Sequence, residues 1–259
     1  MHMKLAQPDL VAARKRLLKM HFESGVGHIG GNLSSLDVLM LLLHEYVSAS
    51  DKLILSKGHS AGALYVALWS IGHLSDEALS TFHRDDTLLA GHPPAAGIVD
   101  ISFATGSLGH GLSLAAGTAL AFRLLAKKGQ VFCVTSDGEW QEGSTWEALI
   151  FLCHQGLENL TIIVDHNRLQ GFGSTDMVAS MSPLWEKLRG FDADLIVAPG
   201  HELAAIRNAL DAPRARPRII FLETVKGCGV KSMENRMDSH YLPLKEAEYL
   251  RALEELGPS

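Results

Sequence analysis

Short apolar runs that alternate with helical segments constrain the fold of this chain more than any other feature. The expected strands are residues 52–56, 131–135, 160–165, 193–198 and 218–225. Strands of this length separated by helices are typical of a doubly wound, mostly parallel α/β sheet with helices on both faces. Because no repeat, low-complexity tract or flexible linker interrupts the pattern, we expect residues 1–259 to form a single domain.

Helices are predicted where apolar residues recur on one face and capping residues mark the ends. They cover residues 8–22, 36–47, 63–72, 75–83, 112–126, 144–156, 182–190, 201–212 and 244–256. Ser75 is the expected N-cap of the fourth helix, because Asp76 and Glu77 follow it in the first turn. Residues 23–35, rich in glycine, histidine and serine, are expected to form a loop.

Composition excludes several classes of protein. Hydrophobic residues make up 47% of the chain and charged residues 20%, as in an ordinary globular protein, and the net charge of −6 argues against a nucleic-acid partner. No apolar run approaches the roughly 18–20 residues that span a bilayer, so no membrane partner is expected. The basic N-terminal stretch lacks the apolar core of a signal peptide. The cysteines lack metal-binding spacing and indicate a reducing compartment, by default the cytoplasm: Cys133, Cys153 and Cys228.

Polar side chains follow two of the expected strands at the point where each ends. Asp137 comes directly after the strand 131–135, and Asn167 follows the strand 160–165, which is 167 − 137 = 30 residues later. One helix and one strand fit in this spacing, so we expect the two side chains on neighbouring strands at the same edge of the sheet. Carboxylate and amide oxygens with a nearby carbonyl suit Mg²⁺ or Ca²⁺.

Glycine and a helix start lie beside this pair. Gly138 allows the backbone to approach an anion closely, and a helix beginning near Ser144 directs its N-terminus to the same edge. An isolated Asp-Gly pair usually marks only a turn. The strand-end asparagine and the surrounding glycines favour instead a site for a divalent cation and a diphosphate.

Six motifs in order resemble the N-terminal, thiamine diphosphate-binding part of transketolase. They are SGVGHIGGNLSS, LILSKGHSAGALY, GHPP, TGSLGHGLSLAAG, SDGEWQEGSTWEA and DHNRLQ, and the resemblance extends over nearly the whole chain. SDGEWQEG followed by DHNRL is similar to the cofactor fingerprint of the family, with Ser136 where the family has glycine. Serine has a narrower φ range, so the local turn is expected to differ.

The resemblance implies thiamine diphosphate as cofactor together with Mg²⁺, or Ca²⁺ or Mn²⁺ in its place. The implied metal ligands are Asp137, Asn167 and the main-chain oxygen of Leu169. Gly138 is expected to present its N–H to the diphosphate. The remaining implied cofactor contacts are His59, Gly106, Ser107, Leu108, Glu139 and His240, with the TGSLG backbone meeting the aminopyrimidine.

The resemblance also implies catalytic roles for His28, His59, His92, His240 and Glu142. His28 is expected near the reacting carbon of the cofactor, and His92 at the hydroxyl groups of the donor sugar. Glu142 is implied in a proton network between two active sites. Histidines suit this chemistry because they titrate near neutrality and pass protons in both directions. The other histidines are expected to be polar loop residues: His44, His73, His83, His154 and His201, with His110 open between the two roles.

Full-length transketolases also contain a pyrimidine-binding domain and a C-terminal domain, to which no part of this sequence corresponds. The glutamate that activates the cofactor lies in the pyrimidine-binding domain of the family. The resemblance therefore implies one subunit of a split transketolase that moves a two-carbon ketol unit between sugars or sugar phosphates. The implied partner is a second polypeptide carrying the missing glutamate, in an α2β2 heterotetramer.

Three other functions remain open at this point. The alpha subunit of a 2-oxoacid dehydrogenase has a related fingerprint, but the histidines of GHIGG, KGHS and GHPP suit a sugar donor better. A deoxyxylulose phosphate synthase-like enzyme shares a similar start, but that family is longer and fused. A non-catalytic, cofactor-binding homologue is disfavoured because Asp137, Asn167 and the histidines are all present.

Overall fold

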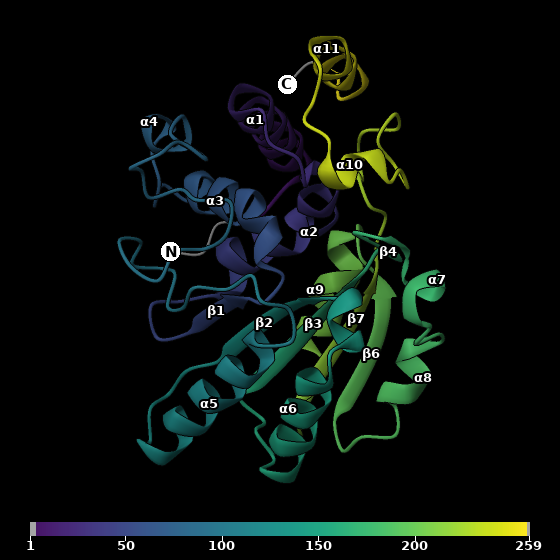
Figure 1. The fold of residues 1–259 in the computed structure, drawn as a ribbon. Coiled ribbons are helices and arrows are strands. Elements are labelled where there is room, and N and C mark those ends of the chain that lie inside the picture. The colour runs from purple at the N-terminus through teal and green to yellow at the C-terminus, as the bar shows by residue number, and fades with distance from the viewer. Residues whose placement is uncertain (1–3, 258–259) are drawn as a thin grey trace.

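A five-stranded parallel sheet forms the centre of the computed structural model, which describes residues 4–257 (Figure 1). Its strands are β1 (Lys52–Leu55), β2 (Val131–Ser136), β3 (Leu160–His166), β6 (Asp194–Pro199) and β7 (Arg218–Glu223). Their order in the sheet is β1-β2-β3-β7-β6, and all pairs are parallel. This arrangement confirms the predicted fold class and all five predicted strands. It also places the carboxyl ends of β2 and β3 side by side, because Ser136 is in register with Asp165.

Helices cover both faces of the sheet (Figure 1). The first face is covered by α1 (Gln7–Ser24), α2 (Ile29–Leu41), α3 (Ala61–Ser70) and α9 (Leu203–Asp211). The second is covered by α5 (Gly111–Leu124), α6 (Gly143–His154) and α8 (Leu184–Leu188). The short α4 (Asp76–Leu79) follows α3, and α11 (Glu246–Glu255) packs on α1 near the C-terminal end, where Tyr249 stacks on Phe22 at 4.4 Å between ring centroids.

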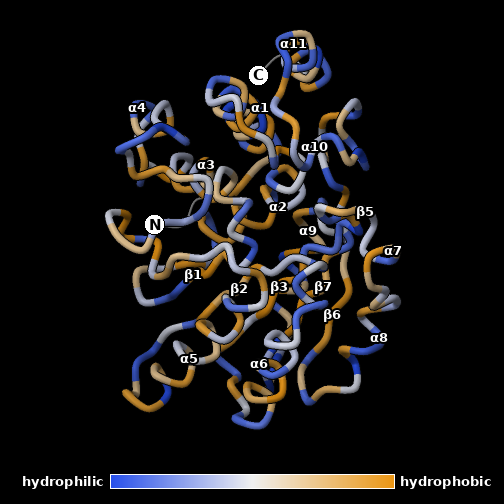
Figure 2. The backbone as a smooth tube through the Cα atoms, viewed as in Figure 1, coloured by the Kyte–Doolittle hydropathy of each residue, from blue (hydrophilic) through white to orange (hydrophobic). Residues whose placement is uncertain are grey.

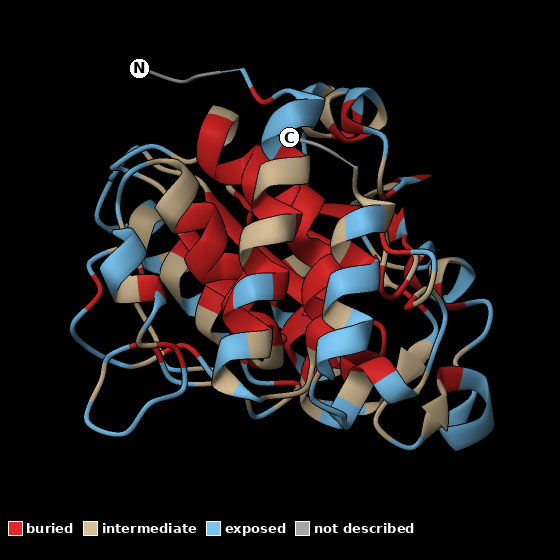
Figure 3. Ribbon diagram, turned by 90° about the horizontal axis from the view of Figure 1, so that it is seen from above, coloured by how far each residue is buried: buried red, intermediate tan, exposed pale blue. Residues whose placement is uncertain are grey.

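The strands alternate their side chains between two hydrophobic cores. In β2, Phe132 and Val134 belong to the core under α1, α2 and α3, whereas Val131 and Cys133 belong to the core under α5 and α6. Successive residues of a strand point to opposite faces, so a sheet covered on both sides needs continuous apolar strands. Figure 2 shows hydrophobic stretches along strands such as β6, and Figure 3 shows the buried residues in the middle of the molecule with exposed ones around them.

The loop predicted at residues 23–35 is wrong over its second half. Helix α2 already begins at Ile29, and all of its residues are buried, including Gly30, Gly31 and Ser34. Small residues are required here by packing, since a β carbon at Gly30 would meet Ser239 and Lys226. Close approach to a neighbouring segment therefore overrides the low helix propensity of glycine and serine.

Some elements of the fold have no counterpart in the predictions. They are the hairpin β4 (Leu169–Gln170) and β5 (Gly173–Ser174), the helices α7 (Thr175–Ala179) and α10 (Asp238–Tyr241), and a 3-10 turn at Gly138–Gln141. The Ser75 cap is confirmed, because its hydroxyl accepts a hydrogen bond from Ala78 N at 3.1 Å. Among residues 4–257, no helix combines the length and apolar character that crossing a membrane requires.

Candidate cofactor site

Asp137 lies at the carboxyl end of β2 and faces the turn of residues 167–169 that follows β3. Its Oδ2 accepts a hydrogen bond from Arg168 N at 2.5 Å, and its Oδ1 accepts one from Gly138 N at 2.8 Å. The side chain is 4% exposed. The carboxylate predicted to bind the metal is therefore next to the backbone that carries the other two predicted ligands.

Hydrogen bonds fix the orientation of the Asn167 amide. Its Nδ2 donates to Asp165 Oδ2 and to Ser34 Oγ, both at 3.2 Å. Its Oδ1 consequently faces the turn, where it accepts a bond from Leu169 N at 3.1 Å. The amide thus offers its oxygen, not its nitrogen, on the side of Asp137, as a cation ligand must.

The charge of Asp137 is poorly compensated by the protein. Burial, and then the negative charge of Asp165, raise its pKa to about 7. A buried carboxylate, an amide oxygen and the Leu169 carbonyl form a donor set of hard oxygens, and a cation there would offset the cost of the buried charge. The three predicted ligands therefore fit a divalent cation.

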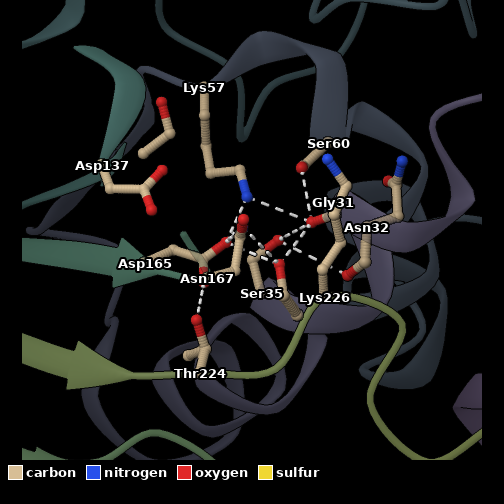
Figure 4. Close-up of polar contacts among 12 residues, drawn as sticks. Gly31, Asn32, Ser35, Lys57, Ser60, Asp137, Asp165, Asn167, Thr224 and Lys226 are labelled. Carbon is tan, nitrogen blue, oxygen red and sulfur yellow. Dashed lines mark hydrogen bonds and ion pairs between the residues drawn. The ribbon is translucent and has the colours of Figure 1, made fainter. Parts of the chain in front are cut away.

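A buried hydrogen-bond network centred on Asp165 lies next to Asp137 and Asn167 (Figure 4). Asp165 pairs with Lys57 and accepts hydrogen bonds from Thr224 and, at 2.6 Å, from Ser34 Oγ. Burial raises the pKa of Asp165, but the pairing with Lys57 and the hydrogen bonds from Ser34 and Thr224 together hold this pKa below its ordinary value. Lys57 Nζ also donates to the Gly31 carbonyl at 3.1 Å, so the network ties the ends of β1 and β3 to α2.

Three histidines from separate segments converge beside the predicted metal ligands. The ring centroids are 5.8 Å apart for His28 and His59, 5.2 Å for His28 and His240, and 6.0 Å for His59 and His240. We call these three the histidine group. Lys226 links His240 to the predicted metal ligand Leu169. Its Nζ contacts His240 Nδ1 and donates to the Leu169 carbonyl at 3.2 Å.

The histidine group is uncharged at neutral pH. Burial, and then the charge of Lys226, lower the pKa of His240 to about 3. Burial also lowers the pKa of His28, and that of His59 well below its ordinary value. Neutral imidazoles can both accept and donate hydrogen bonds, which suits contact with the hydroxyl groups of a sugar.

Hydrogen bonds hold the His28 backbone in an unfavourable conformation. His28 has a φ of 65°, a left-handed conformation that costs a non-glycine residue about 1–3 kcal/mol. Asn32 Nδ2 donates to the carbonyls of His28 at 2.8 Å and His59 at 3.1 Å, and His28 N donates to the His240 carbonyl at 2.8 Å. The structure therefore fixes the backbones of all three histidines relative to one another.

The KGHS and TGSLG motifs lie against each other next to the histidine group. A β carbon on Gly58 would come within 2.7 Å of Gly106 N, and one on Gly106 within 2.6 Å of the His92 ring. His92 is exposed beside this contact, and Ser107 and Leu108 continue the same loop. Gly58 therefore allows KGHS to approach TGSLG, and Gly106 allows TGSLG to approach His92.

The geometry agrees with the comparison to known families. The model described as "Transketolase, thiamine diphosphate binding domain" matches residues 23–259. The chain belongs to the transketolase family.

Two relatives of similar length are named as transketolase subunits. The chain is 32% identical over 257 residues to an apulose-4-phosphate transketolase subunit of Actinobacillus succinogenes, covering 95% of this chain and 93% of that protein. It is 36% identical over 255 residues to the 6-deoxy-6-sulfo-D-fructose transketolase subunit SqwG of a Clostridium species. This match covers 94% of this chain and 93% of that protein.

Solved transketolases share the fold. That of Leishmania mexicana superimposes with a TM-score of 0.88 at 24% identity, covering 99% of this chain. The chain spans 42% of the length of that protein, so it corresponds to less than half of an undivided transketolase.

Two acidic residues of this transketolase chain have different surroundings. Glu139 is 1% exposed, and its carboxylate accepts hydrogen bonds from Gly109 N and Ser136 N, each at 3.0 Å, and from the Ser56 hydroxyl. These internal donors argue against the expected direct contact with the cofactor, and they give Glu139 a role in joining two loops. Glu142 is exposed at the start of α6 and lies beside Gly109.

The sequence analysis missed several residues of the transketolase site. Their positions at the carboxyl ends of strands, where Asp137 and Asn167 were found, could have revealed them. Lys57 follows β1, Asp165 ends β3, and Thr224 and Lys226 follow β7, all at the same edge as Asp137. His201, expected to be a polar loop residue, bonds to Asp37 Oδ2 at 2.8 Å and accepts a hydrogen bond from Val225 N at 2.8 Å. It therefore anchors the segment that carries Lys226.

Asp37, His201 and Cys228 form a second cluster of possible metal ligands, with ligand atoms within 4.8 Å of one another. Both ring nitrogens of His201 are already hydrogen bonded, and Asp37 Oδ1 is paired with Arg14 at 2.5 Å. We therefore assign this cluster a structural role.

Proposed function

We propose that this chain is the diphosphate-binding subunit of a two-component transketolase. In this role it transfers a two-carbon ketol unit from a ketose to an aldose, using thiamine diphosphate and a divalent cation. The observation that carries the proposal is the placement of the histidine group beside the oxygen set of Asp137, Asn167 and Leu169. A cofactor held at its diphosphate by the cation would direct its reactive end toward those histidines.

The protein contributes binding, orientation and proton transfer. Thiamine diphosphate, when bound, supplies the electron sink for cleavage of the carbon–carbon bond. Asp137, Asn167 and the Leu169 carbonyl would hold Mg²⁺. The Gly138 N–H, expected to face the diphosphate, donates to Asp137 Oδ1 at 2.8 Å and so orients this ligand. The neutral histidine group can accept a proton from a donor hydroxyl and return one to the alkoxide that forms on the acceptor, which yields the new alcohol. His92, at the exposed rim, would contact the hydroxyl groups of the sugar.

A partner polypeptide is part of this proposal. Relatives named as transketolase subunits have the length of this chain, and an undivided transketolase is more than twice as long. The partner would carry the pyrimidine-binding domain with its catalytic glutamate, in a complex of two copies of each chain. Glu142, exposed at the start of α6, is placed on the surface where it could join a proton network with that partner.

The proposed substrates are phosphorylated or otherwise modified ketoses. This class follows from the relatives, which are named for apulose 4-phosphate and for 6-deoxy-6-sulfo-D-fructose. The test is to reconstitute the two-chain complex with thiamine diphosphate and Mg²⁺ and to assay a panel of ketose donors with aldose acceptors. We expect ketol transfer with at least one modified ketose. Consumption of pyruvate with release of carbon dioxide, and no ketol transfer, would contradict the proposal.

A further inference from the structure

Tyr241 connects the histidine group to the hairpin that carries the predicted metal ligand Leu169. It is the last residue of α10, and its ring centroid lies 4.5 Å from that of His240 and 5.9 Å from that of His28, in edge-on arrangements. At the other end of the side chain, the phenol oxygen reaches the turn between β4 and β5 at Gly171. Tyr241 thus spans the distance between the two halves of the site.

Two glycines are required by this position of Tyr241. A β carbon on Gly171 would overlap the phenol oxygen and lie 3.0 Å from Cζ, and one on Gly27 would overlap the Tyr241 carbonyl. Gly171 has no positive φ, so its backbone would accept a side chain and only the tyrosine excludes one. The close fit shows that the side chain has a defined place, although 53% of the residue is exposed.

The Tyr241 ring lies between the histidine group and the hairpin that carries Leu169. In the proposed function, on which this inference rests, the diphosphate is held at Leu169 and the reacting carbon lies at His28. The reacting carbon belongs to the thiazolium ring, which is a cation and is joined to the diphosphate by a short ethyl group, so the ring would lie beside the histidine group. An aromatic face attracts a cation through its quadrupole, and Lys57 and Lys226 nearby offer no such attraction.

We propose that Tyr241 is a cofactor-binding residue whose aromatic ring contacts the thiazolium cation. An aspartate or glutamate at this position would also attract the positive charge, but it could gain or lose a proton beside the histidine group. The tyrosine ring attracts the charge without this effect. Its edge-on contacts with His28 and His240 keep the ring in place before the cofactor arrives, which reduces the entropy lost on binding.

The test compares the cationic cofactor with its uncharged deaza analogue, which has the same shape. Both are titrated by calorimetry into the reconstituted complex with Mg²⁺, for the wild type and for Tyr241→Phe and Tyr241→Leu. We expect Tyr241→Leu to weaken thiamine diphosphate about tenfold and the uncharged analogue less than about threefold, as loss of a cation–π contact predicts. Tyr241→Phe keeps the aromatic face, so both affinities should stay within about threefold of the wild type.

Gly171→Ala provides a second route to the same result, because it displaces the ring without removing it. It should reproduce the selective loss, and the double variant with Tyr241→Leu should lose nothing further. Equal weakening of the two ligands by Tyr241→Leu, or no weakening of either, would overturn the role of the ring. If the wild-type complex binds neither ligand, the proposed function itself fails, and this inference fails with it.

Discussion

Asp137 is a buried carboxylate with two backbone donors and a pKa raised to about 7. We expect Asp137→Asn to weaken Mg²⁺-dependent binding of thiamine diphosphate at least tenfold, about 1.4 kcal/mol, because the amide brings no charge to the cation. Titration of the reconstituted complex followed by tryptophan fluorescence would measure this. Asp85→Asn, at an exposed position, is the matched control and should bind like the wild type. Unchanged binding by Asp137→Asn would remove the metal assignment.

His28 combines a left-handed backbone with a place in the histidine group. Asparagine tolerates this conformation better than other residues, so His28→Asn separates the loss of the imidazole from added backbone strain. We expect turnover of the complex to fall by about 10²–10⁴, the range for a lost acid–base group, with the melting temperature nearly unchanged. A folded variant with full turnover would show that the imidazole has no chemical role, and one that fails to fold would show that His28 is required for the structure.

His21 is 1% exposed in the core below α3, and burial lowers its pKa to about 4 from the ordinary 6.5. The neutral form is favoured in the folded state, so its stabilising contribution is complete above pH 6.5 and is lost as the pH falls toward 4. The loss at pH 4 is about 3 kcal/mol. The pKa values of His28, His59 and His240 are also lowered, so a variant is needed to isolate the contribution of His21 to the pH dependence of stability.

Urea unfolding of the wild type and of His21→Leu at several pH values isolates the contribution of His21. The variant should lose less stability between pH 6.5 and pH 4 than the wild type does. His154→Leu, at an exposed position on α6, should keep the wild-type dependence on pH. Parallel curves for the wild type and His21→Leu would show that His21 is not buried in its neutral form.

At the scale of elements, two glycines allow a direct comparison. Gly58 in the KGHS segment has backbone atoms of Thr105 and Gly106 within 2.8 Å of where its β carbon would lie, whereas Gly117 on α5 has open space. We expect Gly58→Ala to separate the two loops and weaken cofactor binding about tenfold or more. Gly117→Ala should leave binding unchanged and stabilise α5 by about 0.5–1 kcal/mol. Calorimetry and thermal melting measure the two effects, and equal behaviour of the variants would contradict the loop contact.

The sequence predicted the elements better than their ends and connections. The five strands were found because continuous apolar runs flanked by helices leave little alternative. The start of α2 was missed because Gly30, Gly31 and Ser34 are poor helix formers, and only tertiary packing makes them helical. The predicted ligands and histidines came from motifs. Lys57 and Asp165 lie at strand ends, which the sequence shows, but their pairing with each other and their bonds to Ser34 and Thr224 join segments far apart in the chain and leave no local pattern.

At the scale of the whole molecule, the site of this chain is one half of an expected two-chain site. The hairpin and α7 beside it expose Phe172, Met177 and Val178, with Phe172 at 88% exposure. Apolar side chains next to a cofactor site are a reasonable surface for the proposed partner.

We expect the isolated chain to catalyse no ketol transfer with thiamine diphosphate, Mg²⁺ and donor–acceptor pairs, because the cofactor-activating glutamate is expected on the partner. Activity should appear on mixing the two chains, and it should saturate at a one-to-one ratio. Sedimentation velocity over a concentration series would show whether the chain alone self-associates through its apolar surface. Turnover proportional to this chain alone, in protein free of any partner, would contradict the two-component assignment.

The network around Asp165 has a consequence for how this site can evolve. Three of its donors, Ser34, Lys57 and Thr224, come from distant parts of the chain, and the fourth, Asn167, lies two residues away. Replacing Lys57 alone would leave a buried carboxylate without its counterion, and replacing Asp165 alone would leave a buried ammonium group. Either single replacement would destabilise the fold by about 3–5 kcal/mol, so we expect the two positions to diverge together. Descendants of this protein should therefore keep both residues or exchange both in one step, even while the surrounding surface changes freely.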